Sequence, residues 1–192
     1  MLARAHARLR RRHPRLLLLL APRRPERAAA LVRALGKQME RVSRGGADGE
    51  DFRLAEIQRR SEEPVLRGDT SIYVIDGFGE LGLFYRAVEL VFLGGTLVAK
   101  GGHNPMEPAR LECFVLHGKH TAAYDSMFAD LDAAGGGMEV EHEEALVFVV
   151  SRMLENPRLR GEAAAAAEMF AASRGRGVVE EAARRLRALM SA

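Results

Sequence analysis

The sequence predicts an α/β fold, namely a doubly wound parallel sheet with helices on both faces and a helical C-terminal tail. Short continuous apolar runs such as Leu16–Leu20 and Leu90–Leu93 are typical of strands buried on both faces of a parallel sheet. Segments with the apolar spacing of helices lie between these runs, as in alternating β and α units. From about residue 143 onward the pattern is helical only.

The first half of the chain contains two expected strands. Leu16–Leu20 forms the first, because Ala21-Pro22 ends the apolar run. The next residues, 25–35, have a helical pattern that Gly36 is expected to end. Residues 37–67 are polar and predict no definite element. The second strand is expected at Ile72–Ile75, followed by a helix at Gly79–Ala87.

The second half begins with a strand at Leu90–Leu93. A compact helix signal follows at Asn104-Pro-Met-Glu107, which offers a capping residue, a proline in the first turn and a glutamate three residues after the cap. The remaining expected elements are a strand at Phe114–His117, a helix at Thr121–Ala133, a short strand at Met138–Val140, and helices at 143–154, 158–172 and 178–190.

The composition is that of one soluble globular domain. Of 192 residues, 47% are hydrophobic and 29% charged. The 29 basic and 26 acidic residues are too evenly balanced to indicate a nucleic-acid partner. The lone cysteine, Cys113, cannot form an internal disulfide, which fits a reducing compartment such as the cytoplasm. We predict a basic N-terminal segment at 1–14 and a globular domain at 15–192.

Arginines crowd the start of the chain and would favour phosphates or an anionic membrane surface. For most of them a solvated basic face is the simpler interpretation, and Arg23 is the exception. The apolar run that follows is too short for a signal peptide or a membrane span.

Three segments place glycine or charge where a predicted strand ends: Ala21–Arg27, Gly94–Thr96 and Gly101–Glu107. We expect them to cluster at one edge, because ligands of open α/β sheets bind outside the carboxyl ends of the strands. Glycines allow close backbone approach, and helix N-terminal N–H groups suit a phosphate. Arg23 or Arg24 would supply the countercharge.

Two of these side chains have alternative interpretations. Glu107 either completes a capping box with Asn104 or accepts hydrogen bonds from sugar hydroxyls, and both roles are compatible. His103 either contacts a phosphate or bonds the loop backbone.

Other polar residues are assigned structural roles. His117 and His120 lack a carboxylate or cysteine companion at a recognised metal-ligand spacing, so we expect no metal site and no cofactor. Asp76 and Glu80 form a possible catalytic carboxylate pair, but helix capping is the favoured interpretation.

The segment Gly101–Ala109, preceded by Val91–Leu97, resembles the signature of 3-deoxy-D-manno-octulosonic acid (Kdo) transferases, a GT-B glycosyltransferase family. Further similar segments, in the family's order, are Ala21–Arg27, Gly79–Arg86 and Val115–His120. The resemblance runs from about Leu16 to the C-terminus.

The resemblance implies a Rossmann-like C-terminal domain that binds the donor CMP-Kdo. The acceptor-binding N-terminal domain, which would supply the catalytic base, is expected to be absent, so no catalytic residue is assigned. A separate chain would then complete the enzyme. The implied reaction transfers Kdo to a lipid A precursor at the cytoplasmic face of the bacterial inner membrane. The implied donor-binding residues are Arg23, Gly94, Gly95, Thr96, Gly102, His103, Asn104 and Glu107.

The sequence also departs from the family pattern. Glu112 and the polar insertion at 45–51 are unlike typical members. Four further positions differ from the usual residue: Arg24 (usually His), Gly77 (Thr), Lys119 (Pro) and Ala123 (Asn). These departures support an alternative, in which the chain is a non-catalytic nucleotide-binding module or a degenerate fragment of the family.

Overall fold

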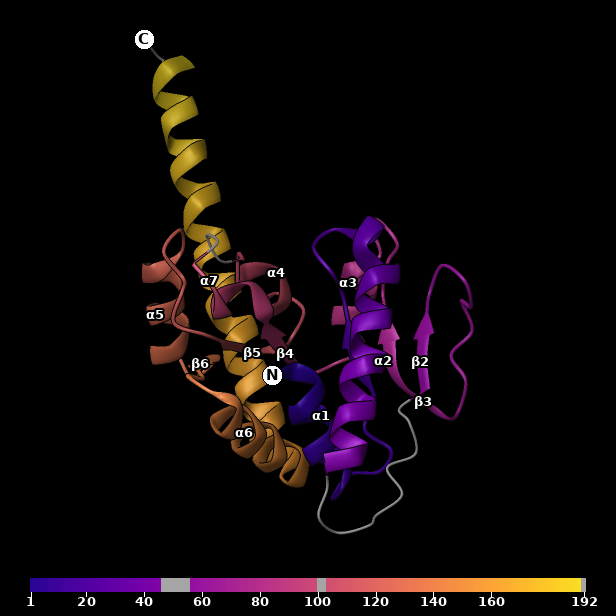
Figure 1. The fold of residues 1–192 in the computed structure, drawn as a ribbon. Helices are drawn as coiled ribbons and strands as arrows, with labels where there is room; N and C mark the ends of the chain where they lie inside the picture. Colours follow the sequence, from indigo (N-terminus) through magenta and orange to yellow (C-terminus); the bar gives the residue numbers. More distant parts are fainter. Residues whose placement is uncertain (46–55, 100–102, 191–192) are drawn as a thin grey trace. The chain divides into compact units, whose positions relative to one another are not determined.

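The computed structural model describes residues 1–45, 56–99 and 103–190. The chain divides into two units, which are described separately below. Unit 1 comprises Met1–Phe84 and His142–Arg152, and unit 2 comprises Tyr85–Glu141 and Met153–Ala192. Figure 1 labels their helices and strands.

The sheet of unit 1 has three parallel strands in the order β1-β3-β2. They are β1 (Leu18–Leu20), β2 (Glu56–Arg59) and β3 (Thr70–Val74). The central strand is the buried one, and its Ile72 and Val74 enter the core. The leucines of β1 are only half-buried, because this strand pairs on one side only within the sheet. Burial of the first strand on both faces was therefore a wrong expectation.

Unit 1 opens with a helix that the sequence patterns did not predict. Helix α1 (Leu2–Arg10) buries a face of small residues that includes Ala3 and Ala7, and these pack into the core of unit 1. Its Arg4 projects outward and pairs with Glu143 at 2.8 Å. The arginines of this segment indicate a basic surface. The alternating alanines could have predicted a closely packed helix, but this pattern was not recognised. The predicted boundary between residues 14 and 15 stays a prediction.

The next helical stretch is longer than expected. The 3-10 turn η1 (Pro25–Arg27) leads into α2 (Ala28–Gly45), which runs through Gly36. The expected helix end at Gly36 is wrong because this glycine does not adopt the positive φ that ends helices. Leu35, one residue earlier, is buried in the core, so packing continues the helix. Two further helices are α3 (Leu81–Tyr85) and α6 (Glu143–Glu155).

The sheet of unit 2 also has three parallel strands, in the order β4-β5-β6. Its strands are β4 (Leu90–Leu93), β5 (Phe114–His117) and β6 (Gly137–Glu139), close to the predicted positions. The central β5 is buried along its whole length. The helical elements are η2 (Gly94–Leu97), α4 (Met106–Ala109), α5 (Asp125–Ala133) and α7 (Pro157–Met190).

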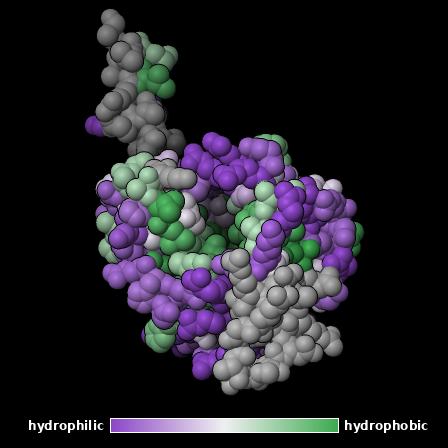
Figure 2. All heavy atoms as spheres, in the orientation of Figure 1, coloured by the Kyte–Doolittle hydropathy of each residue, from purple (hydrophilic) through white to green (hydrophobic). Residues whose placement is uncertain are grey.

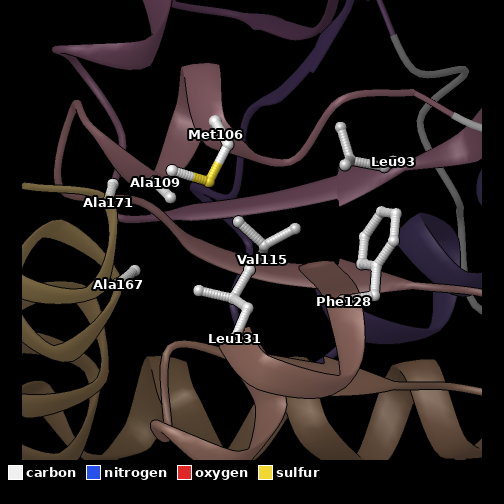
Figure 3. Packing of buried hydrophobic residues seen from close by; sticks show 8 residues of the cluster. All are labelled: Leu93, Met106, Ala109, Val115, Phe128, Leu131, Ala167 and Ala171. Carbon is white, nitrogen blue, oxygen red and sulfur yellow. The ribbon is translucent and has the colours of Figure 1, made fainter. Parts of the chain in front are cut away.

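The core of unit 2 joins β4, β5, α4, α5 and the first half of α7. Figure 3 shows Val115 of β5 between Met106 of α4 and Leu131 of α5, with Ala167 of α7 nearby. Ala167 is fully buried, and its small side chain lets the helix approach closely. A Cβ atom on Gly136 would lie 2.5 Å from the Ala167 Cα. The turn before β6 therefore accepts only glycine.

Helix α7 is continuous over 34 residues, whereas a break between residues 172 and 178 was expected. Gly175 and Gly177 weaken a helix but do not stop it, since neither adopts a positive φ. In Figure 1 the final turns of α7, drawn in yellow, extend beyond the sheet of their own unit.

The predicted fold class is confirmed: every strand pair is parallel, helices alternate with strands, and the tail is helical. In Figure 2 hydrophilic residues make up much of the visible surface, and hydrophobic residues gather in several groups between them. Within the described residues, no helix is both long enough and apolar enough to cross a membrane.

Candidate functional site

The candidate site in unit 2 lies where two neighbouring strands end. Leu93, the last residue of β4, is paired with His117, the last residue of β5. The 3-10 turn η2 begins directly after β4, and the loop from Gly118 begins directly after β5. Gly94, Gly95 and Thr96 therefore lie at the carboxyl edge of the sheet, as predicted, and beside the β5–α5 loop.

Thr96 fixes these two loops to each other. Its fully buried hydroxyl donates to the Leu93 carbonyl at 2.6 Å and accepts from the Gly118 N–H at 2.6 Å. The Thr96 carbonyl accepts a further hydrogen bond from the His120 N–H at 3.0 Å. Since the hydroxyl is already engaged twice, the side chain of Thr96 holds the edge in shape. Any contact of this residue with a ligand would have to use other atoms.

The two glycines of η2 differ in what surrounds them. A Cβ atom on Gly95 would lie 2.2 Å from Nδ1 of His103, so the half-buried imidazole packs over this glycine. His103 thus contacts the η2 turn, which was predicted to belong to the same site. Gly94 is exposed and open, because no atom lies within 4 Å of the place that a Cβ atom would take there. Only at Gly95 does close packing explain the glycine.

For Glu107 the sequence left two roles open, a capping box with Asn104 or hydrogen bonds from sugar hydroxyls. The Asn104 side-chain oxygen accepts a hydrogen bond from the Met106 N–H at 2.9 Å, which starts the short helix α4. Glu107 is exposed and has no hydrogen-bond partner among the described residues. The reciprocal half of a capping box is thus not formed there, and the Glu107 carboxylate is available to a ligand.

Glu107 also lies close enough to Tyr85 to affect it electrostatically. Burial raises the pKa of the Tyr85 phenol to about 12, and the negative charge of Glu107 adds to this shift. Tyr85 is buried and stays neutral near pH 7, so it adds no charge next to Glu107.

Two predicted residues stand apart from this group. Arg23 belongs to unit 1, where it follows β1, is exposed and has no ion-pair partner in the described part of the chain. Gly102 lies outside the described residues. Of the eight predicted residues, the structure describes six in unit 2: Gly94, Gly95, Thr96, His103, Asn104 and Glu107. It brings His103 onto the η2 turn at Gly95, and Asn104 and Glu107 follow His103 at the start of α4.

The sequence missed a shallow hollow of about 240 Å³ next to this edge. It is lined by Ala99, by the loop residues Lys119–Ala122, and by Asp125 at the start of α5. The available signal was positional, because this loop follows the central strand at its carboxyl end.

His117 has a structural role. Its Nδ1 lies 3.0 Å from the Gly118 carbonyl and its Nε2 lies 3.1 Å from an Asp132 oxygen. Both partners are hydrogen-bond acceptors, so these contacts favour the doubly protonated ring. Burial alone would lower the pKa of His117, but the hydrogen bonds to Asp132 and Gly118 outweigh burial and raise it. The described residues contain no group of three or more potential metal ligands.

The carboxylates of Asp76 and Glu80, in unit 1, form ion pairs and not the favoured helix caps. Asp76 accepts from Arg59 at 2.9 Å, and Glu80 forms two bonds with Arg60 at 2.7 and 2.8 Å. Burial would raise the pKa of Asp76, but the Ser61 hydrogen bonds and Arg59 outweigh it and lower that pKa. Paired in this way, neither group is suited to act as a base.

The chain resembles several known proteins in sequence. No protein-family profile matches the chain. It is 34% identical over 157 residues to the 3-deoxy-D-manno-octulosonic acid transferase of Haemophilus influenzae, covering 81% of this chain and 33% of that protein. With the Bordetella pertussis enzyme of the same name it shares 29% identity over 164 residues, covering 83% and 34%. The chain thus spans about one third of these curated relatives.

Solved structures give the same picture of the fold. The C-terminal CMP-Kdo binding domain of WaaA from Acinetobacter baumannii matches with a TM-score of 0.72 at 22% identity, covering 87% of this chain and 79% of that one. The C-terminal domain of a group 1 glycosyl transferase family protein from Francisella tularensis matches with a TM-score of 0.58 at 14% identity, covering 89% and 76%. At these identities the likeness establishes the fold.

Proposed function

The chain belongs to the 3-deoxy-D-manno-octulosonic acid transferase family, and we propose that it forms the donor-binding part of such an enzyme, holding CMP-Kdo for transfer of Kdo to a lipid A precursor. The proposal is supported by the fold, by the relatives' names and by the edge at which β4 and β5 end. The observation that carries it is the exposed Glu107 carboxylate, unpaired within the described residues and placed on a helix that Asn104 begins.

In this proposal each polar group has a defined task. Glu107 accepts hydrogen bonds from the ribose hydroxyls of the cytidine, and Asn104 positions the helix that presents it. The open backbone of Gly94 allows the donor to approach closely, next to Gly95 and the His103 imidazole that packs over it. Arg23, which belongs to unit 1, stays a predicted contact of the donor phosphate. Gly102 stays a predicted member of the same loop.

Glycosyl transfer also needs a base next to the acceptor hydroxyl. We propose that an acceptor-binding domain supplies this base, as the family resemblance implies. On its own the chain should bind CMP and transfer no Kdo. Measurable transfer by the purified chain alone would contradict this assignment of the base.

The decisive experiment is calorimetric titration of CMP into the protein and into Glu107→Ala. We expect binding to the parent chain and a loss of about tenfold or more in the variant, since a charge-assisted hydrogen bond contributes about 1.5–3 kcal/mol. Glu141→Ala is the matched control, because Glu141 is also an exposed glutamate of unit 2. Failure of the parent chain to bind CMP would instead favour the degenerate-fragment alternative.

The basic start suggests where such a protein would work. Arg12 and Arg15 are exposed and unpaired among the described residues, whereas Arg4 and Arg8 are engaged by Glu143 and its neighbour. We propose that the free arginines contact anionic lipid at the inner face of the bacterial inner membrane. Sedimentation with anionic vesicles should retain the protein, and Arg12→Gln combined with Arg15→Gln should release it. Equal retention of both proteins would contradict this contact.

A further inference from the structure

His117 is a buried polar residue that joins the start of the β5–α5 loop to helix α5. It ends β5, and its side chain is 3% exposed. Nδ1 lies 3.0 Å from the carbonyl oxygen of Gly118, the first residue of the loop, and Nε2 lies 3.1 Å from a carboxylate oxygen of Asp132 on α5. The ring centre lies 4.4 Å from that of Phe128, which restricts the plane of the imidazole. One side chain therefore connects the loop to the helix that follows it.

Glycines on both sides of this contact leave room for it. A Cβ atom on Gly137 of β6 would lie 2.5 Å from a carboxylate oxygen of Asp132, so the absence of a side chain there lets the carboxylate approach the imidazole. A Cβ atom on Gly118 would lie 2.7 Å from the Thr96 carbonyl oxygen. The Gly118 N–H is bonded to the Thr96 hydroxyl, and the Gly118 carbonyl lies next to His117. Gly118 is thus held from two sides, by η2 and by the imidazole.

The charges around His117 favour a protonated ring. Burial opposes its charge, but the hydrogen bonds to Asp132 and Gly118, together with the negative charges of Asp132 and of Glu139 on β6, raise the pKa of His117 above its ordinary value. On the loop itself, Lys119 is exposed to solvent and His120 is half-buried. Positions that other elements place beside this end of β5 are uncharged: Leu93 of β4, Thr96 of η2, Phe128 of α5 and Ala167 of α7.

The two ring protons of His117 are not equivalent. A hydrogen bond to a carboxylate is roughly twice as strong as one between neutral groups, so the neutral ring keeps its proton on Nε2, next to Asp132. Nδ1 then has a lone pair that lies 3.0 Å from another acceptor, the Gly118 carbonyl oxygen. The contact with Asp132 survives this change, whereas the contact with the loop becomes repulsive. Loss of one proton from His117 therefore acts on the loop.

We propose that His117 is a positioning residue for the candidate site: with both ring nitrogens protonated it holds the β5–α5 loop against η2, and loss of the Nδ1 proton loosens that loop. The hold is complete below about pH 6.5, the ordinary pKa of histidine, and is lost as the pH rises through the higher folded-state value. His117 is too deeply buried to touch a ligand, so it acts through Gly118 and Thr96. Its effect on CMP rests on the proposed function, whereas its effect on the loop does not.

The test follows the ring and the loop of the full chain separately as the pH is raised. NMR spectra that correlate ring nitrogens with ring protons report the protonation of each histidine nitrogen, and the His117 signals are those that His117→Gln lacks. Hydrogen exchange, corrected for the intrinsic rate, reports the protection of the Gly118 and His120 amides, which bond to Thr96. We expect the neutral ring to carry its proton on Nε2. Protection of the two amides should fall roughly three- to tenfold over the same pH range, as expected for loss of one hydrogen bond.

Three variants separate this positioning role from a merely structural one. Asp132→Asn removes the carboxylate, so the ring titration and the fall in protection should both move to lower pH. His117→Gln has no titrating ring and should show no fall in protection. His142→Gln is the matched control, because it changes an exposed histidine of unit 1, and it should leave the ring titration and the protection curve unchanged.

Calorimetry gives the effect on the ligand. CMP affinity should weaken by a similar factor as His117 titrates, at pH values above the second ionisation of the phosphate, near pH 6. CMP affinity that stays constant while the loop loosens would overturn the positioning role. Equal protection on both sides of the titration would overturn the inference, and so would a neutral ring with its proton on Nδ1.

These outcomes are distinct from failure of the proposed function. A chain whose loop protection follows the titration of His117 but which does not bind CMP keeps the device in the loop and loses the proposed function. A chain that binds CMP with constant loop protection keeps the proposed function and loses the role of His117.

Discussion

Substitution of Gly118 by alanine tests whether the η2 turn and the β5–α5 loop hold each other in place at the sheet edge. A Cβ atom at this position would lie 2.7 Å from the Thr96 carbonyl oxygen and 3.1 Å from the Thr96 carbonyl carbon. Both are backbone atoms, so no side-chain rotation relieves the contact. The loops must separate, which strains the hydrogen bonds from Gly118 and His120 to Thr96.

The expected loss of stability follows from these contacts. Overpacking of a well-packed position costs about 1–3 kcal/mol, and each weakened hydrogen bond costs about 1 kcal/mol. The sum of about 3–5 kcal/mol should lower the urea midpoint by about 1 M or more. Gly94→Ala is the matched control, because Gly94 lies on the same edge with nothing within 4 Å of a new Cβ.

The assay is urea unfolding followed by circular dichroism, combined with hydrogen exchange read out on peptides. Exchange should accelerate around Thr96 and His120 in Gly118→Ala, and it should stay unchanged around β3 in unit 1. CMP binding should weaken as well, because the proposed donor site depends on the same edge. Parent-like stability and exchange in this variant would refute the reasoning.

Three further predictions concern unit 2. Glu112 is the only non-glycine residue with a positive φ (58°) in the described part of the chain, so Glu112→Gly should raise thermal stability by about 0.5–1 kcal/mol; an unchanged melting temperature would count against strain there. Gly136→Ala should cost about 3 kcal/mol because the new Cβ meets the α7 backbone, whereas Gly161→Ala, with open space, should be stabilising in the same melting assay. The raised pKa of His117 stabilises the fold fully below about pH 6.5, and this contribution disappears as the pH rises through the folded-state value; His117→Gln should remove that pH dependence of the urea midpoint, and a parent-like pH profile would contradict it.

The strands could be predicted from the sequence because they are nearly uninterrupted apolar runs. Leu90–Leu93 and Phe114–His117 coincide with β4 and β5 to the residue. Helix ends were harder to predict, since a glycine stops a helix only where it adopts a positive φ. Gly36 does not adopt a positive φ, so helix α2 continues through it. Gly79 and Gly135 have a positive φ and lie in turns. That difference depends on tertiary packing, which the local sequence does not contain.

The candidate site was predictable in part for a similar reason. Glycine and polar residues after β4 marked the edge, and the structure places Gly94, Gly95 and Thr96 there with His103 packed over Gly95. The tasks of individual atoms were not predictable, because Thr96 uses its hydroxyl to join the loops and Asn104 uses its amide oxygen to begin α4. In the sequence Lys119 is only a departure from the family pattern, and the structure places it in the wall of a hollow with Ala99 and Asp125.

Another departure from the family pattern has a local structural explanation. At residue 77 the chain has glycine where threonine is usual, and a Cβ atom there would lie 2.2 Å from Oε2 of Glu80. Arg60 holds that carboxylate with two hydrogen bonds, and its guanidinium lies 5.3 Å from the centre of the Phe84 ring. The Glu80 carboxylate therefore occupies the space that a side chain at 77 would enter, so the edge of unit 1 stays filled and ordered.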